Sequence, residues 1–268
     1  MKLLNGKELA EYVKERQAKQ VRGLRQAWHV QPKLAIVIAN HDSVIETYVR
    51  LKKTYGEDIL VEVEVHTTEM AALAEKIHSL NADSSVHGIV VQLPLADTSQ
   101  TDEMLRLIDS AKDVDGLSGA SNFVSATTTA IDWLLAGYNV SLRGRKIAIV
   151  GEGRLVGAPL AKLWRGAGLD VQTYNDTVKD LRSELRLADV IVSATGVPGL
   201  ITDDMVKIGA AVVDAGTASE NGQIVGDVAE AVRERQDIAI TPVKGGVGPL
   251  TVAALFDNVI TAARATVS

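Results

Sequence analysis

Two side chains that could support acid–base chemistry lie four residues apart in the segment Tyr48-Val-Arg-Leu-Lys52. Residues 43–55 have the composition of a helix, and positions four apart on a helix share one face. An aromatic neighbour at the rim of a sheet can exclude water from a lysine, which favours the neutral amine. Lys52 could then act as a base or stabilise developing negative charge. The alternative is that Lys52 and Lys53 are both solvated surface residues.

Two further polar positions could join this lysine. Gln92 directly follows the apolar run Gly88-Ile-Val-Val, and ligand-binding groups of open α/β sheets gather at the carboxyl ends of strands. It could orient a lysine or a substrate amide, or it could only satisfy loop backbone. Asp113-Val-Asp115-Gly116 predicts a tight turn that presents a carboxylate, or a helix cap. No third carboxylate or histidine lies at a useful spacing, so no metal site is expected.

A glycine-rich turn predicts a second kind of site. Gly151-Glu-Gly-Arg-Leu-Val-Gly157 lies between a predicted strand, 146–150, and a helix that continues through Trp164. Such a turn can cradle a phosphate, because its amides and the helix N-terminus favour an anion. The spacing Gly-x-Gly-x-x-x-Gly is one residue longer than the commonest dinucleotide form. Asn175-Asp176 ends the next strand, where an acidic residue would hydrogen-bond a ribose 2′-hydroxyl.

The segment Ile240–Thr251 holds three glycines and two prolines. Gly reaches backbone angles that other residues avoid, and Pro fixes φ and removes a donor, so we expect an irregular loop rather than a helix or strand. Such a loop brings main chain close to a ligand or to another segment, or it is an ordinary turn between domains.

The elements that must position these residues alternate between helix and strand. Continuous apolar runs such as Leu34–Ala39 are typical of strands buried on both faces of a parallel sheet. The other predicted strands are 60–65, 87–92, 146–150, 169–174, 190–193 and 211–214. The predicted helices are 5–27, 43–55, 69–80, 101–109, 123–137, 157–164 and 250–265. This order predicts an α/β protein with parallel sheets and right-handed crossovers, and a second unit that begins after residue 145.

Composition excludes several classes of function. A chain of 268 residues forms one large or two modest domains. A net charge of −6 without a block of Lys and Arg argues against nucleic-acid binding. With no cysteine there are no disulfides or thiolate metal sites. The charged N-terminus does not resemble a signal peptide, and no apolar run approaches the ~20 residues of a membrane span. We expect a cytoplasmic protein that does not bind membranes.

Several of these segments occur together, in order, in one known family. The matching motifs are Tyr48-x-x-x-Lys52, Gly88-Ile-Val-Val-Gln92-Leu-Pro-Leu, Lys112-Asp-Val-Asp115-Gly116, Val156-Gly157-Ala-Pro159, Gly226-Asp-Val228 and Thr241-Pro-Val-x-Gly-Gly-Val-Gly-Pro-x-Thr251. With them the whole chain resembles the bifunctional methylenetetrahydrofolate dehydrogenase/cyclohydrolase family. That family oxidises 5,10-methylenetetrahydrofolate to the methenyl form, handing a hydride to a nicotinamide, and hydrolyses the product to 10-formyltetrahydrofolate in one-carbon metabolism.

The resemblance implies an architecture as well as a reaction. It implies a folate-binding catalytic domain over 1–122, completed by a returning helix in 249–268, and a Rossmann-type dinucleotide-binding domain over 123–248. It also implies a homodimer formed through the dinucleotide domains.

By position in the family motifs, Lys52 is the catalytic lysine of hydrolysis, Tyr48 packs on the folate, Gln92 tunes Lys52 and Asp115 anchors the pterin. Leu93, Gly248 and Pro249 are implied as substrate contacts. The implied cofactor contacts are Gly151, Glu152, Gly153, Arg154, Gly157, Asp176 and Thr217.

The chain departs from the family where the cofactor would bind. The family's Gly-Arg-Ser is Gly151-Glu152-Gly153 here, and its His-Ser is Asn175-Asp176. The family's arginine meets the 2′-phosphate of NADP, whereas Glu152 and Asp176 would repel it, and Arg154 could offset part of this repulsion. We therefore expect NAD to be favoured over NADP. Other departures are Ile45, Ser125–Thr128 and Lys244.

Three alternatives stay open at this point. The altered turn is compatible with a cyclohydrolase that has lost the dehydrogenase. The departures at Ile45, Lys244 and 125–128 are compatible with a non-catalytic folate- or nucleotide-binding homologue. A Rossmann dehydrogenase for an unrelated substrate would leave 241–251 and the Tyr48–Lys52 pair unexplained.

Overall fold

The computed structural model describes residues 2–40, 43–220 and 223–267, and the chain divides into two compact units. The first, here called the glycine-turn unit, comprises Met1–Ala10 and Thr127–Thr251; the second, the Lys52 unit, comprises Glu11–Ala126 and Val252–Ser268. These boundaries differ from the predicted 1–122, 123–248 and 249–268 at the N-terminus. Residues 2–10 group with the glycine-turn unit because the short strand β1 (Lys2–Leu3) extends its sheet.

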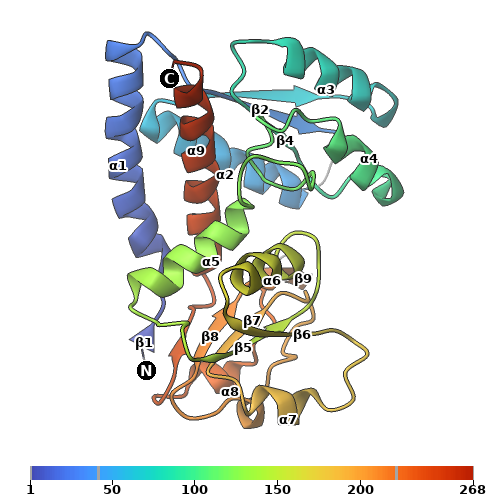
Figure 1. Ribbon diagram of the computed structural model, residues 1–268. Helices are drawn as coiled ribbons and strands as arrows, with labels where there is room; N and C mark the ends of the chain where they lie inside the picture. Colours follow the sequence, from blue (N-terminus) through green and yellow to red (C-terminus); the bar gives the residue numbers. More distant parts are fainter. Residues whose placement is uncertain (1, 41–42, 221–222, 268) are drawn as a thin grey trace. The chain divides into compact units, whose positions relative to one another are not determined.

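The Lys52 unit is built on a three-stranded parallel sheet in the order β3-β2-β4 (Figure 1). β2 (Lys33–Ile38) is central and buried from Leu34 onward, as its continuous apolar run predicts. β4 (Gly88–Val91) is buried throughout, and β3 (Glu62–Thr67) is the half-exposed edge. β3 begins two residues later than expected, because the preceding helix runs on to Ile59 and Leu60 turns the chain with a positive φ of 66°.

Helices cover both faces of this sheet. α3 (Leu73–Ala82, after the 3-10 turn η1, Met70–Ala72) and α4 (Thr101–Arg106, after η2, Thr98–Gln100) pack on one face through a buried aliphatic cluster. On the other face lie α1 (Gly6–Ala27), α2 (Ser43–Ile59) and α9 (Val247–Ala265). Two buried contacts join these three helices: Tyr55 stacks on Phe256 at 5.2 Å, and Gln17 donates to the Ala253 carbonyl at 2.8 Å.

The glycine-turn unit holds a six-stranded parallel sheet in the order β1-β11-β8-β7-β5-β6. Its strands are β5 (Lys146–Val150), β6 (Asp170–Tyr174), β7 (Val190–Ser193), β8 (Ala211–Asp214) and β11 (Ala239–Ile240), besides β1. From β5 the chain adds β6 on one side and then crosses to β7 on the other, so strand order reverses between β5 and β7. Ligands of such sheets bind at the carboxyl ends of the strands at this switch point.

The helices of this unit include α5 (Ala126–Gly137), α6 (Gly157–Gly166), α7 (Leu181–Leu185) and α8 (Glu230–Arg233), with a 3-10 turn η3 (Asp203–Met205). α5 and α6 are tied by the Trp164 indole, which donates to Asp132 at 3.1 Å. Residues of α7 and α8 pack with β5, β7 and β8 in a second aliphatic cluster. A small hairpin, β9 (Ala218–Glu220) with β10 (Gln223–Val225), follows β8.

The segment 240–251 is less irregular than its sequence predicts. Ile240 ends β11 and α9 begins at Val247, so irregular chain is confined to residues 241–246. Pro249 is the third residue of α9, where its missing N–H would have no helical acceptor, so the proline is compatible with the first turn.

The described helices include none that is long and apolar enough to cross a membrane.

Candidate active site and dinucleotide turn

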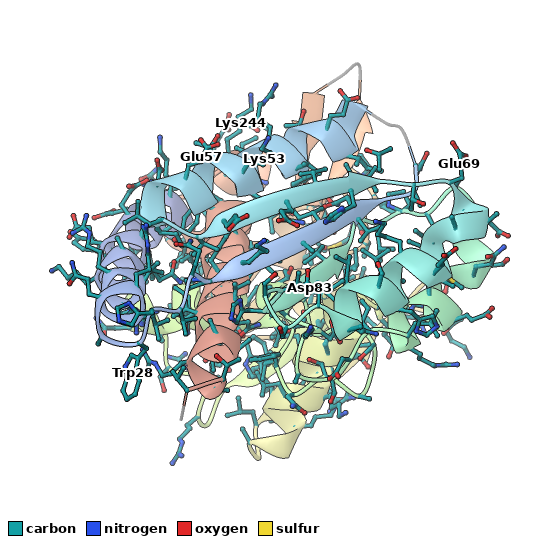
Figure 2. All side chains as sticks on the ribbon, turned by 90° about the horizontal axis from the view of Figure 1, so that it is seen from above. Trp28, Lys53, Glu57, Glu69, Asp83 and Lys244 are labelled. Atoms are coloured by element: carbon teal, nitrogen blue, oxygen red, sulfur yellow. The ribbon has the colours of Figure 1, made fainter. Side chains whose placement is uncertain are left out.

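Lys52 is the centre of the polar site in the Lys52 unit. Helix α2 buries Ile45, Val49 and Ile59 on one side, and this packing leaves the next residue, Lys53, exposed. Figure 2 shows Lys53 and Glu57 on the outward side of α2. The Lys52 side chain instead is partly buried, and its Nζ donates a 2.8 Å hydrogen bond to Gln92 Oε1. The interpretation that both lysines are solvated surface residues is therefore wrong for Lys52.

Gln92 is held from two directions. Its backbone N–H donates to the Val37 carbonyl at 2.9 Å, which continues the β2–β4 ladder past the end of β4. Its side-chain Nε2 donates to the Leu93 carbonyl at 3.2 Å, which fixes the amide so that Oε1 faces the lysine. Gln92 is only 9% exposed. The Gln92 side chain is thus hydrogen-bonded to Lys52, and its task of orienting the lysine stays a prediction.

Electrostatics at this site favour a neutral amine on Lys52. Burial lowers the pKa of Lys52, and the Asp115 carboxylate acts in the opposite direction. Burial raises the pKa of Asp115, with Lys52 opposing and Asp113 reinforcing that shift. Tyr48, one helical turn before Lys52, is partly buried, which raises the pKa of its phenol. Each group is therefore pushed toward its uncharged form, and the Lys52–Asp115 attraction limits the effect.

The loop that carries Asp115 is built by its neighbours. Asp113 is 1% exposed, and its carboxylate accepts from the backbone N–H groups of Gly116 at 3.1 Å and Ser118 at 2.9 Å. Gly116 has φ +72°, and a Cβ there would meet Ser125 N at 2.7 Å, so the turn requires glycine. The predicted tight turn is present, with Asp113 organising it and leaving Asp115 partly buried beside Lys52.

Two residues that support this loop were missed by sequence reasoning. Asn258 on α9 donates to the carbonyls of Val114 at 2.8 Å and Val124 at 3.1 Å. Lys112 Nζ donates to three carbonyls at the end of α3, those of Leu80, Asn81 and Asp83. Asn258 lies beside Asp257 in α9, and no local pattern indicates which distant loop Asn258 holds.

The glycine turn has the geometry of a phosphate cradle. Gly151 has φ +97°, and a Cβ there would meet the Ala194 carbonyl oxygen at 2.5 Å. A Cβ on Gly157 would meet the Gly151 oxygen at 1.8 Å, whereas Gly153 has nothing within 4 Å. The turn leads into α6 at the β5–β7 switch point, so open space lies in front of a helix N-terminus. This arrangement fits the pyrophosphate of a dinucleotide.

The remaining predicted cofactor positions are spread around this turn. Glu152, Gly153, Arg154 and Asp176 are all exposed, as is Thr217, which follows β8. Glu152 is held by β6, since its two carboxylate oxygens accept 2.7 Å hydrogen bonds from Thr173 and Asn175.

The predicted substrate residues do not all lie in one unit. Tyr48, Lys52, Gln92, Leu93 and Asp115 belong to the Lys52 unit, whereas Gly248 and Pro249 belong to the glycine-turn unit. Their placement beside Lys52 therefore stays a prediction.

Two family profiles cover this chain. The tetrahydrofolate dehydrogenase/cyclohydrolase catalytic domain matches residues 4–115, and the NAD(P)-binding domain of the same family matches residues 125–267. The chain belongs to the tetrahydrofolate dehydrogenase/cyclohydrolase family. It is an enzyme with the two activities of that family, methylenetetrahydrofolate dehydrogenase and methenyltetrahydrofolate cyclohydrolase, and it has a folate substrate and a Rossmann-type NAD(P)-binding domain.

Individual relatives match over nearly their whole length. The bifunctional protein FolD of Macrococcus caseolyticus is 37% identical over 277 residues, covering 98% of each chain. The crystal structure of the bifunctional enzyme FolD from Campylobacter jejuni superposes with a TM-score of 0.94 at 36% identity, covering 99% of each chain. The Trypanosoma brucei FolD enzyme, solved with NADP and an inhibitor, gives a TM-score of 0.93 at 29% identity over 99% of this chain and 98% of that one.

Proposed function

We propose that Lys52 is the base of the cyclohydrolase step. The hydrogen bond between Lys52 Nζ and Gln92 Oε1, together with the burial that lowers the lysine pKa, carries this proposal. Water adds to the methenyl carbon while the neutral Lys52 amine takes one of its protons, which gives a neutral carbinolamine. The carbinolamine hydroxyl then loses its proton and N5 gains one as the bond from this carbon to N5 breaks, so the carbon becomes the formyl carbonyl on N10. One of water's two protons thus ends on N5 and the other is released, which balances the loss of the substrate's positive charge. An ammonium could not act as this base and would repel the cation.

Gln92 and Asp115 have different proposed tasks around this lysine. Gln92 Oε1 accepts from Nζ and holds the amine in one direction, while its own Nε2 is fixed by the Leu93 carbonyl. Asp115 anchors the donor edge of the pterin, and its raised pKa is compatible with a buried ligand-facing carboxyl. Tyr48 packs against the folate rings, and Leu93, Gly248 and Pro249 complete the substrate contacts.

The dehydrogenase step is proposed for the glycine turn. A nicotinamide dinucleotide supplies the hydride acceptor when it is bound. The backbone of Gly151, Gly153 and Gly157 would hold its pyrophosphate, because a side chain at Gly151 or Gly157 would clash with main chain. Arg154 and Thr217 would line the remainder of the cofactor site, whereas Asp176 is exposed beyond the end of β6. The intact cradle argues against the hydrolase-only alternative that the altered turn sequence favours.

NAD is the proposed preferred cofactor. Glu152 and Asp176 place two negative charges near the expected ribose site, and a 2′-phosphate there would meet like charge. The Trypanosoma brucei relative was solved with NADP, so the family fold itself accommodates the phosphate and the choice rests on side chains near the ribose.

The experiment that tests the lysine role compares the two activities in one variant. In Lys52→Met, methenyltetrahydrofolate hydrolysis should be lost while NAD-dependent oxidation of 5,10-methylenetetrahydrofolate persists. Undiminished hydrolysis would overturn the assignment of Lys52.

We also propose a cytoplasmic homodimer formed through the glycine-turn units, which rests on the family resemblance.

A further inference from the structure

The carboxylate of Glu152 is fixed at the end of β6 by residues outside the glycine turn. Its Oε1 accepts from the Thr173 hydroxyl at 2.7 Å, and its Oε2 accepts from Asn175 Nδ2 at 2.7 Å. These two hydrogen bonds lower the pKa of Glu152, so the group is anionic at neutral pH. A surface carboxylate with no partners would sample many rotamers, whereas this one is directed by one donor in β6 and one directly after it.

A second layer fixes Thr173. Arg165 on α6 donates from Nη2 to the Thr173 hydroxyl oxygen at 3.1 Å and from Nε to the Val171 carbonyl at 3.2 Å. The Thr173 hydroxyl accepts a hydrogen bond from Arg165 and donates one to Glu152. Thr173 therefore connects the Arg165 cation to the Glu152 carboxylate through two successive hydrogen bonds.

The Glu152 carboxylate is held at a strand end where dinucleotide folds bind the adenosine ribose. In dinucleotide folds an acidic residue at the end of the second strand accepts from the adenosine ribose. Counted from β5, which precedes the glycine turn, β6 is that second strand. Here the residues at that strand end, Thr173 and Asn175, are neutral, and the acid comes from the turn itself. A carboxylate offers about four lone-pair sites, so two remain for a ribose diol after Thr173 and Asn175 have bound.

Asp176 differs from Glu152 in each of these respects. It is exposed, and across the described residues its carboxylate makes no hydrogen bond or ion pair. Both polar atoms of the neighbouring Asn175 side chain are hydrogen-bonded: Oδ1 accepts from Thr177 N at 3.0 Å, and Nδ2 donates to Glu152. Asp176 therefore contributes a solvated charge rather than a directed acceptor, and a solvated charge is strongly screened.

We infer that Glu152, positioned by Thr173 and Asn175, is the residue that selects NAD, by accepting from the ribose hydroxyls and excluding a 2′-phosphate, and that Asp176 has little part in the selection. The inference rests on the proposed dinucleotide function of this unit. It also assigns Thr173 as a positioning residue, and it leaves Arg165 as a cation that a 2′-phosphate could use once the carboxylate is gone.

Direct binding to the purified full-length protein tests this assignment. Calorimetry with NAD and NADP, and with the fragments adenosine 5′-monophosphate and adenosine 2′,5′-bisphosphate, compares the unaltered chain with Glu152→Gln and Asp176→Asn. The two substitutions each remove one negative charge from an exposed side chain. We expect Glu152→Gln to weaken NAD and tighten NADP by about tenfold each, because one charge-assisted interaction is lost and one repulsion removed. Asp176→Asn should change each dissociation constant less than about twofold.

Thr173 provides the second measurement. Thr173→Val should shift the NAD/NADP ratio in the same direction as Glu152→Gln but less, and Thr173→Ser, which keeps the hydroxyl, should restore it. A purely structural role would lower the melting temperature in Thr173→Val without changing the ratio, and that result would overturn the positioning role.

Two outcomes distinguish failure of the Glu152 assignment from failure of the proposed dinucleotide-binding function. Equal shifts in Glu152→Gln and Asp176→Asn, or no shift in Glu152→Gln, would overturn the inference while binding of NAD leaves the dinucleotide function intact. Failure of the unaltered protein to bind either dinucleotide or either fragment would overturn the dinucleotide function, and this inference with it.

Discussion

At the scale of single residues, the site depends on where one lysine ends up. The sequence places Tyr48 and Lys52 on one helical face, and that much is predictable from a spacing of four. It could not distinguish Lys52 from Lys53, because local periodicity does not reveal which side chain the sheet covers. The hydrogen bond to Gln92 joins residues 40 positions apart in the chain, and such a contact follows only from the way β2, β4 and α2 pack.

The exposed neighbour gives a matched control for the role of Lys52. Lys52→Met should lower the rate of methenyltetrahydrofolate hydrolysis by about 10²–10⁴-fold, the range for loss of a general base. Lys53→Met, on the outward side of α2, should leave hydrolysis unchanged. Rates measured by the loss of methenyl absorbance on both variants check this. Equal losses in the two variants would mean that charge or helix stability, rather than the Lys52 amine, is responsible.

The charge of Asp115 sets a second expectation, for the pKa of Lys52 itself. Asp115 favours the ammonium form, so Asp115→Asn should lower the Lys52 pKa further below the ordinary value near 10.4. Neutral amine would then be reached at a lower pH than in the unaltered protein. Nitrogen-15 NMR titration of lysine, with Lys52→Met to assign the resonance, measures the shift.

The control for this titration is Glu57→Gln, which removes a negative charge from the outward side of α2. It should leave the Lys52 pKa nearly unchanged. An increase of the Lys52 pKa in Asp115→Asn would contradict the electrostatic account of the site.

At the scale of elements, most helices and strands could be predicted because their periodicity is strong. The exceptions are short or depend on distant partners. β1 has two residues and exists because β11 offers an edge to pair with. The loop 240–251 contains enough glycine and proline to argue against regular structure, yet Val247-Gly248-Pro249 opens α9, since the first turn of a helix tolerates a missing N–H.

The junction of α1 with this loop predicts opposite effects for two glycines in the same helix. Lys7 N donates to the Gly245 carbonyl at 2.9 Å, and a Cβ on Gly6 would meet the Gly246 oxygen at 1.8 Å. Gly6→Ala must displace the loop and should destabilise the protein by about 1–3 kcal/mol. Gly23 has nothing within 4 Å of an added Cβ, so Gly23→Ala should stabilise by up to about 1 kcal/mol.

Thermal or denaturant unfolding of the two variants measures the predicted loss of stability in Gly6→Ala and the predicted gain in Gly23→Ala. A Gly6→Ala protein as stable as the unaltered chain would contradict the tight junction. If Gly248 and Pro249 contact the folate as the family resemblance implies, Gly6→Ala should also raise the KM for the folate substrate, whereas Gly23→Ala should not.

At the scale of the whole molecule, the α/β class and the two-domain organisation follow from the alternation of elements and from motifs spread over the chain. The family profiles divide at residues 115–125, close to the predicted boundary, whereas the compact units divide within α1 and α9. The sequence does not predict these unit boundaries within α1 and α9. The apolar pattern of a helix continues unchanged through the residue at which its packing partners change.

The proposed homodimer belongs to this scale. Light scattering coupled to gel filtration should give twice the 28.5 kDa mass of one chain. A mass of one chain at concentrations well above those used in the assay would contradict the proposal, and it would leave the residue-level assignments untouched.

The most direct test of the account is turnover of the natural substrate with each cofactor. Purified protein is mixed with 5,10-methylenetetrahydrofolate and either NAD or NADP, and reduced nicotinamide is followed. We predict reduction of NAD well above that of NADP, because the proposed role of Glu152 is to repel a 2′-phosphate. Comparable or faster reduction of NADP would contradict the cofactor assignment, and reduction of neither would contradict the dehydrogenase activity.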